Sequence, residues 1–252
     1  MAEAGLSVAR VFAREGARLF LAGRTMATLD TGARDIRAAG GAAETAVVDV
    51  LEETAVRDHA AAVAAQAGGI DIALNATSFL HDQGTPLADL SLEAFMLPVD
   101  RFLRALFITS KAVAPHMGRK RQGVILTLSA PGARMAAGGH LGHAASAAGT
   151  EAFSRVLADE LGPRNIRVVC LRPHAIADAP DAGSYTADLF APKAKAMGLS
   201  VGQWLGGAAY GTMLKRLPTL ADVAETAALL ASDRASAVTA AVANLSCGAL
   251  AD

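Results

Sequence analysis

The chain has 252 residues, of which 52% are hydrophobic and 19% are charged. This is enough apolar material for one well-covered core and too little length for two full domains, so we expect a single domain over residues 1–252. The formal net charge of -1 and the 4% of aromatic residues argue against nucleic-acid binding, because they provide neither a broad basic surface nor many rings for base stacking.

No apolar run approaches the roughly 20 residues that a membrane span requires. The first residues also lack the cationic start and apolar stretch of a signal peptide. We therefore expect a cytoplasmic protein with no membrane partner. In a reducing compartment a disulfide is rare, so Cys170 and Cys247, in or beside apolar runs, are expected to be core thiols.

Short β-like runs alternate with helical runs, which is typical of a parallel sheet covered by helices on both faces. The first element is a helix over residues 3–15, where apolar residues recur at helical spacing before Gly16, a natural helix terminator. Strands are expected over residues 18–22, 43–50, 70–75, 123–129, 166–171 and 238–245. Helices are expected over residues 25–39, 51–67, 86–118, 143–162 and 220–231. The strands are rich in Val, Ile and Leu, as strands buried on both faces are.

The segment over residues 177–215 breaks the alternation with Gly, Pro, Ser and Asp turns around short helical pieces. It contains the lone tryptophan, Trp204, and both tyrosines, Tyr185 and Tyr210. Long insertions in compact domains are often functional, so we interpret it as a lid or substrate loop. The alternative is a surface excursion that binds nothing.

Several segments, in the same order, resemble the short-chain dehydrogenase/reductase family and together cover nearly the whole chain. Residues 216–236 read RLPTLADVAETAALLASDRAS, which is similar to the family's C-terminal segment. Residues 15–24 resemble its second strand, 48–50 the end of its third, and 71–75 the strand before its Asn-Asn-Ala-Gly motif. Residues 162–176 resemble its sixth strand and the loop beyond.

The resemblance implies a Rossmann-like, doubly wound parallel sheet in a three-layer α/β/α arrangement, with strand order 3-2-1-4-5-6-7 and a nicotinamide dinucleotide across the carboxyl ends of the strands. Arg24 would favour a 2′-phosphate and hence NADP over NAD, unless it is an ordinary solvated arginine at a helix start. Asp49 would accept a hydrogen bond from adenine, and it could also cap the next helix. The implied cofactor-binding residues are Gly5, Arg24, Asp49, Val50, Asn75, Ala76, Pro173 and Ile176.

The first strand of the family and its glycine motif are missing from this sequence, which starts inside the following helix with at most Gly5 left of the motif. Without that central strand its two neighbours would stand about 10 Å apart, twice the usual inter-strand spacing. Three outcomes are open: the start codon is misplaced and the protein begins upstream, the two neighbouring strands close up, or the fold is weakened. We favour the misplaced start.

The family's catalytic Tyr-x-x-x-Lys falls on His143 and Ala147, so the phenol that transfers a proton and the ammonium that lowers its pKa are both replaced. The catalytic serine aligns with Ala130 or, one residue away, Ser129. The asparagine aligns near Phe102. We give a low weight to a lid tyrosine, Tyr185 or Tyr210, as a substitute phenol.

An acid/base pair of His143 and His174 is one hypothesis, because imidazole exchanges protons near neutral pH without an activating lysine. The alternative, which we favour, is that both histidines simply line a cleft or cap a helix. His140 adds a third imidazole, but its spacing from His143 without a nearby acidic ligand is a weak metal signal, and we predict no metal. The candidate catalytic residues are Ser129, His143 and His174.

The expected function is that of an oxidoreductase homologue with an NADP-type pocket, a degenerate catalytic site and weak or no ordinary carbonyl reduction. The alternatives are a non-catalytic binding or scaffold homologue and a cofactor-free, histidine-based isomerase or lyase. An active enzyme would take a small apolar carbonyl or alcohol substrate. Relatives pair through the helices that correspond to residues 86–118 and 143–162, so the resemblance implies a homodimer or homotetramer.

Overall fold

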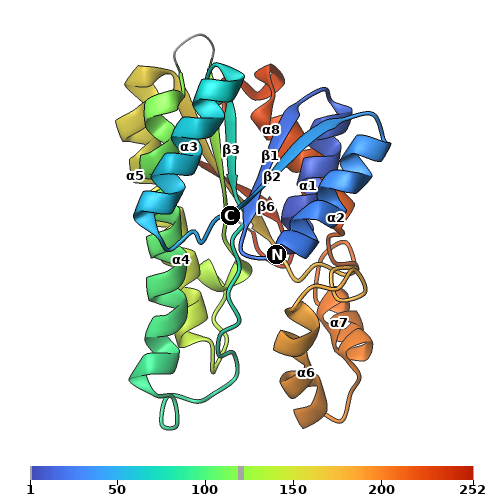
Figure 1. Cartoon of the computed structure of the whole chain (residues 1–252). Helices are drawn as coiled ribbons and strands as arrows, with labels where there is room; N and C mark the ends of the chain where they lie inside the picture. Colours follow the sequence, from blue (N-terminus) through green and yellow to red (C-terminus); the bar gives the residue numbers. More distant parts are fainter. Residues whose placement is uncertain (1, 119–121, 252) are drawn as a thin grey trace.

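The parallel strands form two separate sheets in the computed structural model, which describes residues 2–118 and 122–251. The smaller sheet pairs β1 (Arg18–Gly23) with β2 (Ala42–Val47). The larger sheet has the order β3 (Ile72–Asn75), β4 (Gly123–Leu128), β5 (Ile166–Pro173) and β6 (Ala241–Leu245) (Figure 1). Every pairing is parallel, which confirms the predicted α/β architecture.

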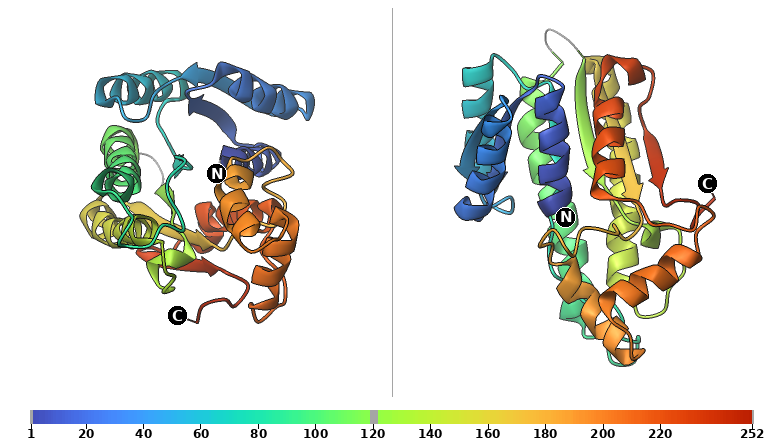
Figure 2. Two further views of the ribbon diagram at one scale, coloured as in Figure 1. Left: turned by 90° about the horizontal axis from the view of Figure 1, so that it is seen from below. Right: turned by 90° about the vertical axis from the view of Figure 1, so that its right-hand side faces the viewer.

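Helices cover both faces of these sheets, as the alternating sequence pattern predicts (Figure 2). One layer consists of α1 (Ala2–Arg14), α2 (Met26–Ala38) and α8 (Leu220–Ala231). The other consists of α3 (Glu53–Ala67), α4 (Leu92–Val113) and α5 (Leu141–Leu161). The two remaining helices, α6 (Thr186–Ala196) and α7 (Val201–Tyr210), form the predicted lid segment at one end of the molecule.

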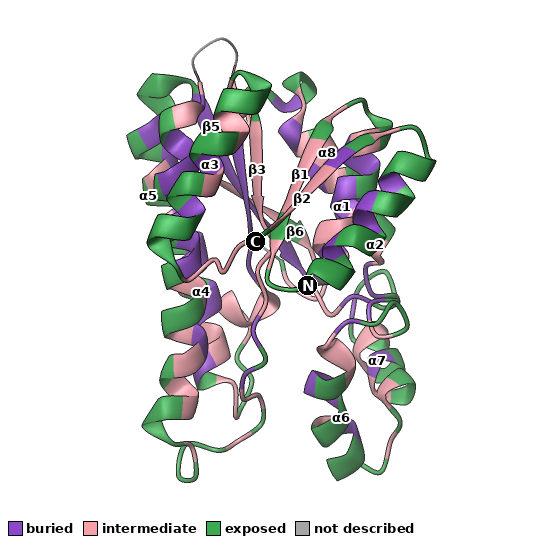
Figure 3. Ribbon diagram, viewed as in Figure 1, coloured by how far each residue is buried: buried purple, intermediate pink, exposed green. Residues whose placement is uncertain are grey.

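The core is centred on β4 and β5, in which every residue is buried. Side chains on alternate faces of these strands join two apolar clusters, one with α3, α4 and α5 and one with α1 and α8. In β1 and β3 no residue is fully buried (Figure 3). Continuous Val, Ile and Leu runs therefore mark the two central strands correctly, while the half-buried strands lie where the sheet is divided.

The division lies between β1 and β3, which form no backbone pairing within the described residues. Helix α1 spans this division: Val8 and Phe12 pack against the four-stranded sheet, and Ala9 packs against α2 and β2. Apolar side chains of β1 and β3, including Leu19 and Leu74, contact the same cluster as α1. The two sheets are thus joined by side-chain packing, and the two strands that flank the division have not closed up.

Most element boundaries agree with the sequence pattern, and the largest difference concerns α4. The pattern predicts a helix from residue 86, but α4 begins at Leu92, where the Ser91 side chain accepts a hydrogen bond of 3.1 Å from the Ala94 N–H. Gly16 has φ of 89° directly after α1, as expected for its terminator role. Cys170 is buried, as predicted, whereas Cys247 is only partly buried.

Candidate functional site

His143 lies in the first turn of α5 and pairs with a histidine that the sequence did not point to, His81. His81 belongs to the segment between β3 and α4, and its Nε2 lies 3.0 Å from His143 Nδ1. The two ring planes differ by 9°, with centroids 5.2 Å apart. Nearly coplanar rings with such a short N···N distance are joined edge to edge by a hydrogen bond rather than stacked face to face.

The hydrogen-bond partners fix which nitrogen of each ring carries the proton. His81 Nδ1 lies 2.7 Å from the Phe79 carbonyl oxygen, which can only accept, so His81 carries its hydrogen on Nδ1. Its Nε2 is then an acceptor, and we assign the His143 hydrogen to Nδ1 because two acceptor nitrogens 3.0 Å apart would repel; the amide nitrogen of Gln83 lies 3.1 Å from the same Nδ1. His143 Nε2 keeps its lone pair and has no hydrogen-bond partner among the described residues. It lies beside Gly132, where a Cβ atom would come within 3.3 Å of it.

A lysine from α6, within the predicted lid segment, completes this cluster. Lys193 of α6 donates to Gln83 Oε1 at 2.7 Å and to His140 Nε2 at 2.6 Å. The amide nitrogen of Gln83 lies 3.1 Å from His81 Nε2 and can donate to it. We call His81, Gln83, His140, His143 and Lys193 the histidine cluster; it joins three segments that are distant in the sequence.

The environment favours the neutral form of His81 and His143. Burial, followed by electrostatic interactions with His81, His140 and Lys193, lowers the pKa of His143 from 6.5 to about 3. Burial also lowers the pKa of His81, and it lowers the pKa of Lys193 from 10.5 to about 8. At neutral pH the group at the catalytic tyrosine position is therefore an uncharged imidazole, which can accept hydrogen bonds and is a poor proton donor.

This lowered pKa predicts that acid destabilises the fold. Between pH 6.5 and 3 the unfolded chain protonates His143 and the folded chain does not, so the stability contributed by the neutral ring is complete above pH 6.5 and is lost as the pH falls toward 3. The expected loss from this residue is about 2 kcal/mol between pH 7 and pH 5. Urea unfolding at both pH values should show a smaller acid loss in His143→Phe than in the unchanged chain; equal losses would contradict the assignment.

Ser129, the other candidate at the family's catalytic positions, lies in a buried ionic network. Its hydroxyl donates to Glu151 Oε1 at 2.8 Å, and Arg172 of β5 lies 3.3 Å from the same oxygen. The side chains of Arg172 and Glu151 are 1% and 6% exposed. The Ser129 hydroxyl hydrogen is therefore already used within the protein, and its role toward a substrate remains a prediction.

The predicted pair of His143 and His174 is not in contact within the described part of the chain. His174 Nδ1 accepts a hydrogen bond of 2.7 Å from the Ala175 N–H, and burial lowers the pKa of this histidine. His143 is paired with His81 instead. No group of three or more His, Cys, Asp or Glu residues in the described ranges is arranged to hold a metal ion.

Several of the predicted cofactor-binding residues lie around the N-terminal end of α1. A Cβ atom on Gly5 would come within 3.0 Å of Ala76, the residue after β3. Ile176, beyond β5, packs against Ala4 of the same helix turn. The carboxyl ends of β3 and β5 thus meet α1 here, as the Rossmann arrangement requires. Pro173 is the last residue of β5, and Val50 packs partly buried against the core.

The polar side chains of the predicted cofactor site have few hydrogen-bond partners within the protein. Asp49 Oδ1 accepts from the Leu51 N–H at 3.0 Å, while the guanidinium of Arg24 lies 5.8 Å from the ring centroid of Phe79. Asn75 accepts from Thr77 through its oxygen, but its buried amide nitrogen has no partner among the described residues. A buried donor without a partner fits a contact that a bound dinucleotide would need.

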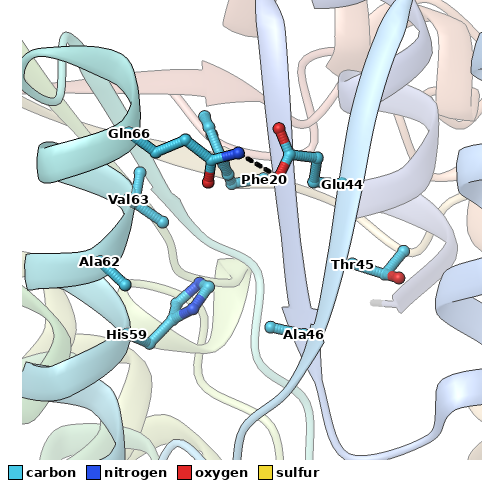
Figure 4. Close-up of a pocket in the computed structure, with 8 residues that line it drawn as sticks. All are labelled: Phe20, Glu44, Thr45, Ala46, His59, Ala62, Val63 and Gln66. Carbon is cyan, nitrogen blue, oxygen red and sulfur yellow. Dashed lines mark hydrogen bonds between the residues drawn. The ribbon is translucent and has the colours of Figure 1, made fainter.

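One cavity lies away from these residues. A cavity of about 140 Å³ is bounded by β1, β2 and α3, and its walls include Phe20, His59 and Gln66 (Figure 4). It contains none of the predicted site residues, and it is smaller than the roughly 300 Å³ of a typical small-molecule site. A second cavity, of about 10 Å³, lies beside Asn75 and Phe102 and has room for about one water molecule.

Known proteins resemble this chain over nearly its full length. A family model described as enoyl-(acyl carrier protein) reductase matches residues 4–249. This chain belongs to the short-chain dehydrogenase/reductase family. The 3-oxoacyl-(acyl-carrier-protein) reductase FabG of Chlamydia muridarum is 28% identical over 236 residues, which is 93% of this chain and 88% of that protein.

A second relative of this short-chain dehydrogenase/reductase is gluconate 5-dehydrogenase of Gluconobacter oxydans, 29% identical over 67% of this chain and 65% of that protein. Among solved structures, sorbitol-6-phosphate 2-dehydrogenase of Erwinia amylovora has a TM-score of 0.88 at 20% identity, covering 99% of this chain and 96% of that one. This likeness shows the fold. The predicted family and the oxidoreductase class are confirmed, and homologues of this family use NAD(P) cofactors.

Sequence reasoning missed the partners of the candidate residues: His81, Gln83, Glu151, Arg172 and Lys193. His81 and Gln83 follow a strand at its carboxyl end, where ligand-binding residues gather in such sheets, so that signal was available. Lys193 lies within residues 177–215, where the sequence pattern does not predict which elements the chain contacts. Among the described residues no helix is long and apolar enough to cross a lipid bilayer.

Proposed function

We propose that this protein is a short-chain dehydrogenase/reductase homologue that binds a nicotinamide dinucleotide, with preference for NADP, and has weak or no ordinary carbonyl reductase activity. The observation that carries this proposal is the state of His143. At the position of the family's proton-donating phenol stands an imidazole whose pKa is about 3 and whose one hydrogen is donated to His81. Ala147, at the position of the activating lysine, is a buried methyl group.

Three polar side chains would hold the cofactor. Arg24 is exposed just after β1 and would meet a 2′-phosphate; the Asp49 carboxylate would accept from adenine; the free amide N–H of Asn75 would donate to the ribose side. A bound nicotinamide would supply a hydride. On the protein side, His143 Nε2 would accept a hydrogen bond from a substrate hydroxyl, while no ammonium at residue 147 would assist proton transfer.

A second candidate is a non-catalytic homologue that uses this fold for binding or assembly. The observation in its favour is the same degenerate site, together with exposed apolar residues such as Phe107 on α4 and Val156 on α5. These helices correspond to those that pair between subunits in relatives, so a homodimer or homotetramer is part of the proposal. The third candidate, a histidine-based isomerase or lyase, is less favoured because an imidazole with a pKa near 3 is a weak base.

Titration of the purified chain with NADPH, followed by cofactor fluorescence, tests the proposal. Saturable micromolar binding with turnover of ketones absent or very slow is expected. Arg24→Ala should weaken NADPH binding by about tenfold or more and leave NADH binding nearly unchanged, because only NADPH carries the 2′-phosphate. No fluorescence change with either nucleotide would remove the cofactor-binding proposal and leave the non-catalytic homologue.

A further inference from the structure

Lys193 is a half-buried cation that has only neutral partners. An ammonium carries three N–H donors, and two of them are directed at Gln83 Oε1 and His140 Nε2. His140 donates from Nδ1 to the Gly138 carbonyl at 2.7 Å, so it accepts from Lys193 as an uncharged ring. Within the described residues Lys193 forms no ion pair and its third N–H has no acceptor.

The nearest carboxylate does not compensate this charge. Asp82 raises the pKa of Lys193 somewhat, but its own oxygens accept from the hydroxyl and the N–H of Thr85, at 2.6 and 3.4 Å. The other neighbours, His81 and His143, are neutral rings that gain nothing from a nearby cation. Removing an ammonium from water without a counter-charge is costly, and the lowered pKa of Lys193 reflects that cost.

We propose that Lys193 forms an anion site beside the histidine cluster and binds the carboxylate of a small carboxylic acid, which replaces Gln83 and His140 as its partner. A single ammonium surrounded by neutral polar groups matches the single charge of a carboxylate better than the charge of a phosphate, which typically recruits several cationic or backbone donors. The proposal rests on the proposed function only in placing this site at the substrate end of the fold.

The lid gives the site a fluorescent reporter. Lys193 Nζ lies 5.8 Å from the ring centroid of Trp204, which is the only tryptophan of the chain. Trp204 also packs against Phe190 of the same helix as Lys193, with centroids 4.8 Å apart. A carboxylate that binds Lys193 changes the charge next to this indole, so intrinsic fluorescence reports the event directly.

The experiment titrates the cofactor-free protein with sodium acetate at constant ionic strength, with acetamide and inorganic phosphate as parallel ligands. We expect saturable quenching or enhancement of Trp204 fluorescence by acetate, with a dissociation constant in the millimolar range, and no saturable change with acetamide. The affinity for acetate should fall as the pH rises above about 8, because Lys193 then loses its proton.

Variants separate this site from a merely structural contact. Lys193→Met should weaken acetate binding by about tenfold or more, Lys193→Arg should retain most of it, and Lys195→Met, an exposed lysine on the same helix, should change nothing. A response to phosphate but not to acetate, or an acetate response that survives in Lys193→Met, would overturn the proposal. The acetate titration contains no nucleotide, so a failure of acetate to bind would contradict the anion site without bearing on the cofactor proposal. Likewise, a failure of NADPH to bind would not bear on the anion site.

Discussion

The double variant His143→Tyr and Ala147→Lys should reduce small ketones with NADPH about 10²-fold or more faster than the unchanged chain, which is the usual value of a well-placed general acid. Tyrosine at residue 143 restores a phenol in the first turn of α5, and lysine four residues later lies one helical turn away on the same face. The positive charge of the lysine lowers the pKa of the phenol. The methyl group of Ala147 carries no charge and has no such effect.

One single variant and a second double variant provide the controls for this gain. Ala147→Lys alone buries an ammonium, since Ala147 is 5% exposed, and should lower stability without raising activity. His143→Phe combined with Ala147→Lys keeps an aromatic ring but has no hydroxyl, so its rate should stay at the background level. Initial rates of NADPH oxidation give the activity of the first double variant and of its two controls. A double variant that folds, binds NADPH and still matches the background rate would show that the scaffold does not hold substrate and cofactor together.

Glu151→Ala should lower the free energy of unfolding by about 3–5 kcal/mol, the cost of removing one partner from a buried ion pair. Glu151 accepts from the Ser129 hydroxyl and from the Arg172 guanidinium, and both charged side chains are almost fully buried. The alanine variant removes an acceptor from both donors and leaves a void in the helix-facing side of the sheet. Urea unfolding monitored by circular dichroism gives the value.

Two milder substitutions test how this loss arises. Glu151→Gln keeps the volume and an oxygen acceptor but removes the charge, so its loss should be smaller than that of alanine. Ser129→Ala removes a single hydrogen bond to a carboxylate and should cost about 1.5–3 kcal/mol. If Ser129→Ala were fully stable and instead abolished the reductase activity of the His143→Tyr, Ala147→Lys variant, the serine would act on substrate rather than in this network.

The fold could be predicted because its determinants are local and repeated. The apolar runs at residues 123–129 and 166–171 correspond to β4 and β5, the strands buried on both faces. The start of α4 was placed six residues too early because the sequence pattern does not separate the turn before Ser91 from the helix after it. The Ser91 side chain caps the first turn of α4 and thereby sets the start of this helix.

The candidate site could be predicted only in part, because its contacts join segments that are far apart in the sequence. His143 was identified from its position in the family pattern, and the structure shows it at the start of α5. Its partner His81 lies 62 residues away, and Lys193 lies 53 residues from His140. Such pairings depend on how α6 and the segment after β3 are placed relative to α5, which no local pattern encodes.

The separation of β1 from β3 has a consequence for how the molecule comes apart. Side-chain packing, chiefly on α1, is what connects the unit of β1, α2 and β2 to the larger sheet in the described part of the chain. This unit can therefore open as a subglobal step without breaking an interstrand hydrogen bond of β3 to β6. Arg24 and Asp49, at the ends of β1 and β2, belong to that less protected unit, so any nucleotide that contacts both would also restrain its opening.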